Sequence, residues 1–398
     1  MVENKDKKVL NVPNLRFKEF EGEWEESTIG KQFELYSGNT PSRINKELFN
    51  GTINWISSGE LKEHYIYSTK ERISQEAANN LKLLSVGTFV IAIYGLEAEG
   101  VRGTGSITQE PSTISQACMA FTPKGEITNE FLYSWYKKHG HVIGVKYAQG
   151  TKQQNLSYDI LEKFKISYPN VKEQDKLNLF FSLLDKRIST QNKIIDKLQF
   201  LIKGISNKLL NMDNGIPICL GEILTERLDR TKKNNQHEIL SSTVKGIFSQ
   251  REYFSKDIAS ENNIGYKVIH LHDIVLSPQN LWMGNINFND KFDIGIVSPS
   301  YKVFSIADGF DKKYVAALLK THHALYNYML VSEQGASIVR RNLNYEAFEQ
   351  LVFKIPSLNK QREIGHALSL LKSRLENANL LIKTYNSQKQ FMLRQMFI

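Results

Sequence analysis

Residues 169–212 of the chain read PNVKEQDKLNLFFSLLDKRISTQNKIIDKLQFLIKGISNKLLNM. Apolar residues recur in this stretch at alternating intervals of four and three, which predicts one long helix with a coiled-coil seam. The expected seam residues here are Leu177, Phe181, Leu184, Ile188, Ile195, Leu198 and Ile202. Pro169 lies just ahead of the pattern, where a helix tolerates proline. At 1.5 Å per residue the seam would span about 50 Å.

The same spacing recurs in a second expected helix at an offset of 187, and Pro356 precedes it as Pro169 precedes the first. Its expected seam residues are Ile364, Leu368, Leu371, Leu375, Ile382 and Met392. Because the two seams share one register, they can pack on each other, and we expect an antiparallel coiled coil.

The similarity between the two halves extends upstream of the helices. Residues 155–158 (NLSY) match residues 342–345 (NLNY) at the same offset, and Gly30 faces Gly221 at a nearby one. An ordered series of matches indicates a tandem duplication, in which each copy is a large domain followed by a basic helix. The duplication predicts pseudo-two-fold symmetry.

The two large domains have the patterns of mixed, strand-rich structures. Strands are expected at 52–57 and 88–94 in the first domain, and at 274–277 and 301–304 in the second. One amphipathic helix is expected in each, at 129–138 and from 312 to 319 onwards. The fold class is therefore α+β. The predicted boundaries are 1–168 for the first domain, 169–213 for the central helix, 214–355 for the second domain and 356–398 for the C-terminal helix.

The formal net charge of +9 is confined to the two helical segments. Residues 1–171 carry 20 basic and 20 acidic side chains, and residues 213–359 carry 16 of each. The excess lies in 172–212, with 8 basic and 4 acidic residues, and in 360–398, with 7 and 2. The chain therefore lacks the uniformly basic surface that a non-specific nucleic-acid coat would need. The basic helices could face DNA, meet an acidic partner or simply be solvated.

Cysteine usage and hydropathy place the chain in a broad class. Only Cys118 and Cys219 are present, which excludes a disulfide framework and a multi-cysteine zinc site and suits a reducing compartment. The longest apolar run, 89–93, is too short to cross a bilayer, and the charged N-terminus is unlike a signal peptide. We expect a soluble, cytoplasmic protein without membrane contacts.

Catalytic and metal-binding motifs are missing from the sequence. There is no phosphate-binding loop, no nucleophile elbow, no H-E-x-x-H and no Pro-Pro dipeptide of an amino-methyltransferase motif. The histidines at 139/141, 270/272 and 322/323 lack carboxylate or cysteine partners at ligand spacing. We therefore expect no catalytic residue, no metal and no cofactor in this chain, and favour a binding protein.

Four short motifs, in order, carry a resemblance to a known family. They are Trp24-Glu25-x-x-x-Ile29-Gly30, the stretch 37–42 (SGNTPS), Gly150-Thr151-x-x-x-Asn155-Leu156 and Pro169-x-x-x-x-Gln174. Together with the duplicated plan, they resemble the specificity subunit of a type I restriction-modification enzyme over essentially the whole chain. The second copy departs from the pattern, because no counterpart of 37–42 follows Gly221.

The resemblance implies a DNA-binding subunit without an active site. Each large domain would be a target recognition domain that reads one half of a bipartite, asymmetric site in double-stranded DNA. The paired helices would set the spacer and dock two adenine methylation subunits, which would use S-adenosylmethionine. Restriction subunits would supply the chemistry that needs ATP and Mg.

Polar and basic residues in the expected loops are the candidate DNA contacts, because arginine reads guanine and amide side chains read adenine. In the first domain the candidates are Thr40, Ser42, Arg43, Lys62, Arg102, Thr104, Lys152, Gln153 and Gln154. In the second they are Arg230, Lys232, Lys233, Gln250, Arg251, Gln279, Asn280, Trp282, Arg340 and Arg341. Trp282 could stack on DNA or lie at the edge of the core, whereas Trp24 and Trp55 are expected in the core.

Two other functions remain open from the sequence. The chain could be a scaffold that assembles a protein complex without DNA, in which case no sequence-dependent DNA protection is expected. It could also be an enzyme with a degenerate motif, which predicts activity from the purified chain alone.

Overall fold

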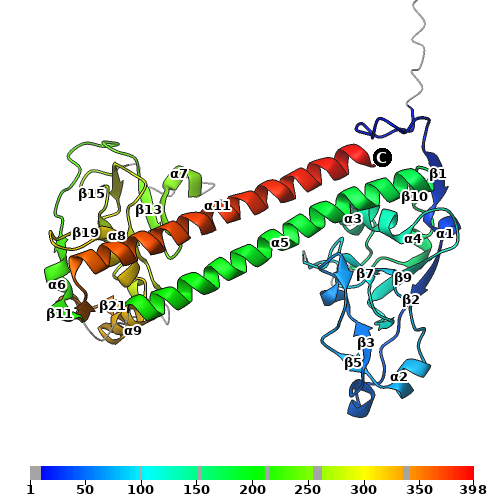
Figure 1. Ribbon diagram of the computed structural model, residues 1–398, viewed down its shortest axis with the longest axis horizontal. Coiled ribbons are helices and arrows are strands. Elements are labelled where there is room, and N and C mark those ends of the chain that lie inside the picture. Colours follow the sequence, from blue (N-terminus) through cyan, green and yellow to red (C-terminus); the bar gives the residue numbers. More distant parts are fainter. Residues whose placement is uncertain (1–9, 99, 151–153, 211–214, 254–261, 335–340) are drawn as a thin grey trace, which may run out of the picture. The chain divides into compact units, whose positions relative to one another are not determined.

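The computed structural model describes residues 10–98, 100–150, 154–210, 215–253, 262–334 and 341–398. The chain divides into two units. Unit 1 comprises residues 1–192 and 380–398, and unit 2 comprises residues 193–379. Two long helices, α5 (Val171–Leu210) and α11 (Leu358–Met396), each contribute one half to each unit (Figure 1).

Unit 1 is built on a five-stranded sheet in the order β2-β9-β6-β7-β4, in which only β4 and β7 run parallel. Its strands are β1 (Glu25–Thr28), β2 (Phe33–Ser37), β3 (Ile53–Ile56), β4 (Tyr65–Ile66), β5 (Arg72–Ile73), β6 (Phe89–Ala92), β7 (Gly105–Thr108), β8 (Ser112–Ile114), β9 (Cys118–Pro123) and β10 (Lys165–Tyr168). β6 is buried along its whole length, as its unbroken apolar sequence predicts for a central strand.

The helices of unit 1 outside the long pair are mostly short. They are α1 (Ile29–Gln32), α2 (Gln75–Asn79), α3 (Asn129–Lys146) and α4 (Tyr158–Leu161), with 3₁₀ turns at Lys46–Phe49 and Ser58–Glu60. α3 begins where expected, because the Thr128 hydroxyl accepts a hydrogen bond from Phe131 N at its first turn. It continues beyond the expected end at 138, and one side of it packs into the core.

Unit 2 repeats this plan with four sheet strands, in the order β12-β19-β16-β17. Its strands are β11 (Ile216–Cys219), β12 (Leu224–Glu226), β13 (Leu240–Thr243), β14 (Gly246–Ser249), β15 (Lys267–His270), β16 (Ile274–Leu276), β17 (Ile286–Phe288), β18 (Ile294–Val297), β19 (Lys302–Ile306), β20 (Ser332–Gln334), β21 (Arg341–Leu343) and β22 (Val352–Ile355). β12, β19, β16 and β17 take the places of β2, β9, β6 and β7 in unit 1.

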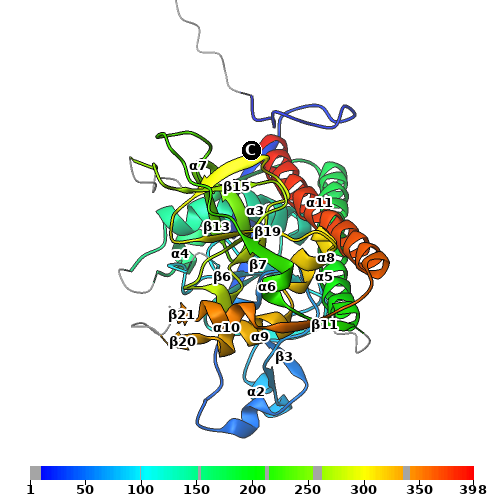
Figure 2. The same ribbon diagram turned by 90° about the vertical axis from the view of Figure 1, so that its left-hand side faces the viewer.

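The helices of unit 2 outside the long pair are α6 (Leu220–Ile223), α7 (Gln250–Tyr253), α8 (Lys312–Leu318), α9 (His322–Leu330) and α10 (Tyr345–Glu349), with a 3₁₀ turn at Leu281–Met283. The single helix expected from 312 onwards is two helices, because Thr321 accepts a hydrogen bond from Ala324 N and so starts α9 anew. Figure 2 shows α9, α10 and the β20–β21 pair gathered at one end of the unit, away from β13 and α7.

Corresponding glycines allow corresponding close approaches of the backbone in the two units. A Cβ atom on Gly30 would lie 2.9 Å from Glu162 Cβ, and one on Gly221 would lie 3.2 Å from Glu349 Cβ. Both glycines belong to the short helix that follows the first strand of a pair, β1–β10 in unit 1 and β11–β22 in unit 2. The sequence repeat pairs Glu349 with Glu162, so the duplication holds in space as well as in sequence.

Each long helix is attached to its domain by one buried glutamine in its first turns. Gln174 donates from Nε2 to Pro169 O and accepts the backbone N–H of Thr128, the residue that caps α3. Gln361 donates to Pro356 O and accepts the backbone N–H of Asp311, which caps α8. These two contacts align α3 with α8 and the start of α5 with the start of α11.

The long helices pack antiparallel inside each unit. In unit 1, Lys389 forms an ion pair with Asp185, and the Arg187 guanidinium lies 4.3 Å from the ring centroid of Tyr385. In unit 2, residues 205 and 210 of α5 share a core cluster with residues 364 and 368 of α11. The expected seam residues are all buried or half-buried on both helices. None of the described helices has the length and hydropathy needed to cross a membrane.

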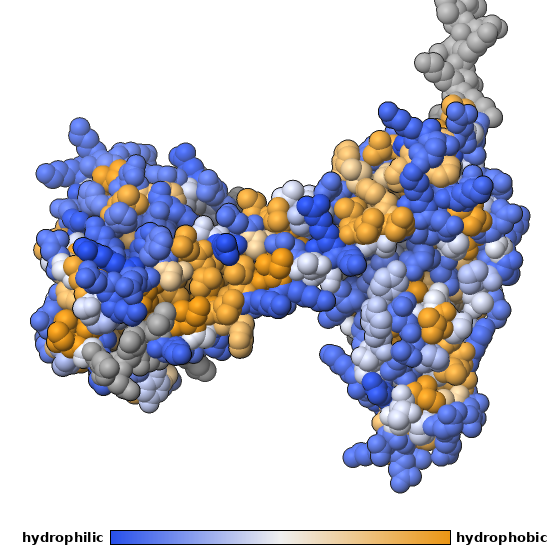
Figure 3. Space-filling view, viewed as in Figure 1, coloured by the Kyte–Doolittle hydropathy of each residue, from blue (hydrophilic) through white to orange (hydrophobic). Residues whose placement is uncertain are grey.

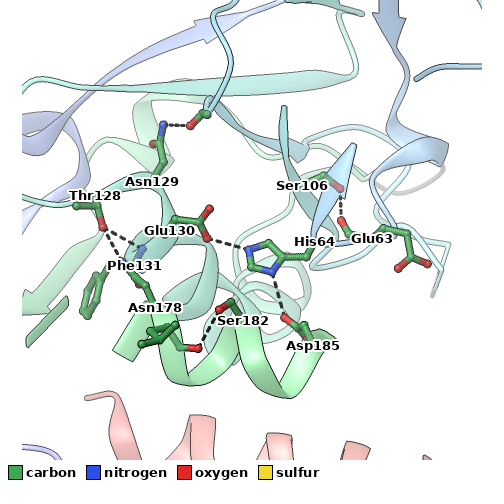
Figure 4. A network of polar contacts seen from close by, with 12 residues as sticks. Glu63, His64, Ser106, Thr128, Asn129, Glu130, Phe131, Asn178, Ser182 and Asp185 are labelled. Atoms are coloured by element: carbon green, nitrogen blue, oxygen red, sulfur yellow. Dashed lines mark hydrogen bonds and ion pairs between the residues drawn. The ribbon is translucent and has the colours of Figure 1, made fainter. Parts of the chain in front are cut away.

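A buried histidine joins the domain of unit 1 to the long helix α5 (Figure 4). The His64 ring lies between Tyr65 and Tyr133, at centroid distances of 4.0 and 3.9 Å with nearly parallel planes. Its Nε2 lies 2.9 Å from Glu130 Oε2 on α3, and its Nδ1 lies 3.2 Å from Asp185 Oδ2 on α5. Asp185 in turn pairs with Lys389 on α11. No sequence pattern indicates this cluster, because its members come from four distant segments.

The charge of His64 makes the stability of unit 1 depend on pH. Burial opposes protonation, but the neighbouring carboxylates of Asp185 and Glu130 outweigh it and raise the pKa of His64. A raised pKa in the folded state means that the stabilisation is complete below about pH 6.5, the ordinary value, and is lost as pH rises through the raised value. We therefore expect the free energy of unfolding to fall with rising pH above 6.5 in the wild type and less so in His64→Gln.

Urea titrations followed by tryptophan fluorescence measure this difference, because three of the four tryptophans, at 24, 55 and 135, lie in unit 1. His141→Gln, at an exposed position of α3, is the matched control. Equal pH slopes in the wild type and His64→Gln would show that the charge of His64 does not stabilise the fold.

Candidate nucleic-acid interface

Four of the expected DNA-contacting residues lie together in unit 2, two of them adjacent in the chain. The loop after β16 places Gln279 so that its carbonyl oxygen accepts the backbone N–H of Arg341, at 3.1 Å. The Arg341 guanidinium lies 4.9 Å from the ring centroid of Trp282, within range of a cation–π contact. We call Gln279, Asn280, Trp282 and Arg341 the unit 2 loop group.

The unit 2 loop group contains buried polar atoms that lack hydrogen-bond partners. These are Nε of Arg341 and Oδ1 of Asn280. Arg341 uses Nη1 to donate to Met329 O, at 3.4 Å. Buried polar atoms are nearly always paired in folded proteins, so atoms of this kind mark a place where a ligand or water can bind.

A corresponding group exists in unit 1. The sequence repeat pairs Gln154 with Arg341, and each forms a backbone hydrogen bond with the loop after the corresponding strand. The direction differs: Gln154 O accepts Leu96 N after β6, whereas Arg341 N donates to Gln279 O after β16. The side-chain Oε1 of Gln154 is buried without a partner, as is Oδ1 of Asn155. Arg102 donates from Nε to Leu96 O, at 2.8 Å, and thus joins the group. We call Arg102, Gln154 and Asn155 the unit 1 loop group.

The other candidates of unit 1 lie elsewhere. Arg43 binds both carboxylate oxygens of Glu71, and its guanidinium lies over the rings of Phe49 and Trp55, at 4.2 and 5.1 Å. Its charge is therefore already compensated within the domain. Thr104 donates its hydroxyl to Val101 O. The remaining candidates are exposed or half-buried loop residues, namely Thr40, Ser42 and Lys62, whereas Lys152 and Gln153 lie outside the described residues.

The other candidates of unit 2 belong to different segments from the loop group. Arg230 donates from Nη1 to Gly265 O, and the backbone N–H of Lys232 donates to the Gln236 side chain. Gln250 starts α7, on which Arg251 is exposed, and Lys233 is exposed beside Lys232. Arg340 lies outside the described residues. Trp282 is half-buried, while Trp24 and Trp55 are both in hydrophobic clusters, as expected.

Neither unit presents a metal site within the described part of the chain, where no three His, Cys, Asp or Glu side chains are placed to hold an ion. Cys118 is buried, which raises the pKa of its thiol to about 12 and leaves it protonated near neutral pH. Sequence reasoning missed two features, the His64 cluster and a lysine-lined cleft in unit 2. Both are formed by residues from distant segments, so no local motif marks them.

Comparisons with known proteins agree with this plan. Residues 21–199 match the family model described as Type I restriction modification DNA specificity domain. The specificity subunit of the Escherichia coli type I restriction enzyme EcoR124I/EcoR124II is 30% identical over 189 residues, which are 46% of this chain and 45% of that protein. The specificity subunit of the MjaIX enzyme of Methanocaldococcus jannaschii is 28% identical over 185 residues, 44% of this chain and 42% of that protein. Each match thus spans less than half of the curated relative.

Solved structures share the fold over nearly the whole chain. The S subunit of a type I restriction-modification system from M. genitalium superposes with a TM-score of 0.64 at 15% identity, covering 97% of this chain and 99% of that one. A chain from a study of complex assembly and conformational transition in a type I R-M system gives a TM-score of 0.51 at 12% identity, with coverage of 94% and 97%. At these identities the likeness concerns the fold.

Proposed function

We propose that this chain, as a member of the family of type I restriction-modification specificity subunits, reads a split, asymmetric sequence in double-stranded DNA. Each domain would read one half of the site. The observation that carries this proposal is the pair of loop groups at corresponding places in two copies of one fold. Each holds arginine or amide side chains with unpaired buried polar atoms, and such side chains read guanine and adenine edges in the major groove.

The domains are suited to sequence reading rather than to charge-driven binding. Residues 1–171 and 213–359 are each electrically balanced, so phosphate attraction cannot dominate their contacts. Discrimination between DNA sequences would therefore come from hydrogen bonds to the bases. The side chains that the two loop groups supply for such bonds are Arg102, Gln154, Gln279 and Arg341. The guanidinium of Arg341 is already oriented by Trp282, which lowers the entropy lost on binding a base.

The long helices would set the distance between the two half-sites and dock the methylation subunits. Their exposed hydrophobic residues recur at the offset of the duplication: Leu183 and Leu370 are 57% and 54% exposed, and Ile194 and Leu381 are 44% and 41% exposed. Figure 3 shows hydrophobic residues at the surface along these helices. Two equivalent apolar faces are what two copies of one methylation subunit would need.

The chemistry would reside in the partners. Methylation subunits would bring S-adenosylmethionine, and restriction subunits would use ATP and Mg, so this chain itself would need no catalytic residue and no cofactor. We place the assembled enzyme in the cytoplasm, where it meets DNA.

Replacing both arginines that precede the second Asn-Leu turn should weaken DNA binding. For Arg340→Ala with Arg341→Ala in the assembled methylation complex, we expect about 30-fold or more loss of affinity for the target site, because each arginine–guanine pair is worth about 1–3 kcal/mol. Fluorescence anisotropy with a target duplex measures the loss, and size-exclusion chromatography checks that assembly is intact. Arg43→Ala is the comparison, and a loss below about threefold is expected because Arg43 already pairs with Glu71 on the surface. Unchanged affinity in the double variant would remove this loop from the interface.

Selection of bound duplexes from a random DNA library by the assembled methylation complex tests the proposed function. Enrichment of one sequence in two parts, separated by a spacer of fixed length and arbitrary composition, is the expected result. Enrichment of a single continuous sequence, or of none, would contradict a two-domain reader.

A further inference from the structure

Unit 2 contains a cleft of about 590 Å³ between β14, β17, α8 and the two long helices. Its walls carry more positive than negative charge: the lysines are Lys203, Lys245, Lys291, Lys313, Lys320 and Lys372, and the carboxylates are Asp290 and Glu376. The lining is partly apolar, with Ile202, Phe248, Phe288, Leu368 and Leu375. Neither the loop groups nor the candidate DNA contacts include these residues.

The duplication identifies the corresponding place in unit 1. The capping contacts of Gln174 and Gln361 align α3 with α8 at an offset of 183 and α5 with α11 at an offset of 187. The cleft residues Lys313, Ala316, Lys320 and Lys372 therefore correspond to Glu130, Tyr133, Lys137 and Asp185. Three of these four unit 1 residues hold His64.

In unit 1 this place is filled by a side chain of the same chain. His64 stacks on Tyr133 and lies within ion-pair distance of Glu130 and Asp185. In unit 2 an alanine stands where the stacking tyrosine would be, and lysines replace both carboxylates. In unit 1 the place beside α3 and α5 is thus acidic and filled by the ring of His64. In unit 2 the corresponding place beside α8 and α11 is basic and open.

Lys320 shows the electrostatic consequence of the open cleft. Its ammonium donates to Gly284 O and to the side-chain oxygen of Asn287, both at 2.8 Å, and both acceptors are uncharged. Desolvation within the cleft, with the nearby charge of Lys372, lowers the pKa of Lys320 to about 8. Lys372 has a carboxylate within reach, Asp290 at 3.6 Å, and both of these side chains stay exposed. A bound anion would relieve the mutual repulsion of the two lysines.

We propose that this cleft is the docking site for a segment of a partner protein that carries carboxylates on either side of an aromatic residue. The carboxylates would be complementary to the lysines of the cleft. The aromatic ring would occupy the space that Ala316 leaves where unit 1 has Tyr133. A protein segment is favoured over a nucleic-acid backbone because the corresponding place in unit 1 holds a protein side chain. The apolar part of the lining also favours a protein segment, since phosphates bury no apolar group. The proposal goes beyond DNA reading and does not depend on it.

A labelled peptide of sequence Ac-Glu-Glu-Tyr-Glu-Glu-NH2 provides the probe, with Ac-Gln-Gln-Tyr-Gln-Gln-NH2 as the neutral control. We expect the full chain to bind the acidic peptide at least roughly tenfold more tightly than the neutral one in fluorescence polarisation. Lys313→Glu with Lys372→Glu should abolish the preference, whereas Lys383→Glu, at an exposed position of α11 in unit 1, should leave it unchanged. Equal binding of the two peptides, or a preference that survives the double reversal, would overturn the proposal.

A second variant tests the proposal through a reversed peptide preference instead of a loss of binding. The triple change Lys313→Glu, Ala316→Tyr and Lys372→Asp gives the cleft the residues found in unit 1. We expect it to prefer Ac-Lys-Lys-Tyr-Lys-Lys-NH2 over the acidic peptide, a reversal that an unfolded variant could not produce. If the acidic peptide fails to bind, and a duplex of unrelated sequence loses affinity with the Lys313→Glu and Lys372→Glu changes, the cleft is a phosphate contact and the proposal is wrong.

Discussion

A matched insertion of four residues into both long helices is expected to change the DNA sequence that the proposed methylation complex modifies. The positions are between Asn192 and Lys193 in α5 and between Asn379 and Leu380 in α11, where one unit passes into the other. Four residues lengthen a helix by about 6 Å, which is close to two base pairs at about 3.4 Å each. We expect methylation at the same two half-sites with a spacer longer by one or two base pairs, and none at the original site.

The matched design matters because contacts within each unit lie on one side of the insertion points. Asp185 and Lys389 stay paired in unit 1, and the contact of Lys372 with Asp290 stays in unit 2. An insertion in α5 alone would move its seam out of register with α11, so that variant should lose methylation altogether and serves as the control. Base-modification sequencing reads out both variants. An unchanged spacer in the matched variant would contradict the proposed ruler role of the helices.

Phe397→Ala is expected to destabilise unit 1 by about 3–5 kcal/mol, the cost of removing a buried phenylalanine side chain. The Phe397 ring is 2% exposed and lies 5.1, 5.6 and 6.3 Å from the rings of Phe131, Phe181 and Trp24, measured between centroids. It thus ties the end of α11 to α3, to α5 and to the segment before β1. Urea unfolding followed by tryptophan fluorescence measures the change.

Phe391→Ala is the matched control for this prediction, because Phe391 lies on α11 and is 50% exposed. We expect that variant to lose less than about 1 kcal/mol. A loss of similar size in both variants would mean that the C-terminal end of the chain does not pack into the core of unit 1 as described.

The architecture could be predicted from the sequence because its main signals are periodic. Apolar residues spaced alternately by four and three from Leu177 onwards predict one face of a helix. The same spacing from Ile364 onwards predicts a second copy of that helix. The expected strands at 52–57 and 88–94 contain β3 and β6, whose apolar runs are buried. The division of the expected helix at 312 into α8 and α9 was missed, because Thr321 acts as a cap only once the chain bends there.

The candidate site was predictable only in outline. The sequence predicts Arg341 as a DNA contact because it is a basic residue in an expected loop, and the structure places it against Trp282 and Gln279. The sequence predicts Arg43 as a DNA contact on the same ground, yet Glu71, from a separate segment of the domain, neutralises it. Pairings of this kind depend on how distant segments fold together, and neither periodicity nor a local motif encodes them.

Base-modification sequencing of genomic DNA from cells that co-express this chain with the proposed methylation subunit tests whether this chain selects the methylated sequence. We expect methyladenine at one split sequence, with both half-sites and the spacer visible in the same data, and loss of the signal when either subunit is omitted. If the two subunits co-purify and no sequence gains methylation, or if methylation persists without this chain, the chain is not the reader of the DNA sequence.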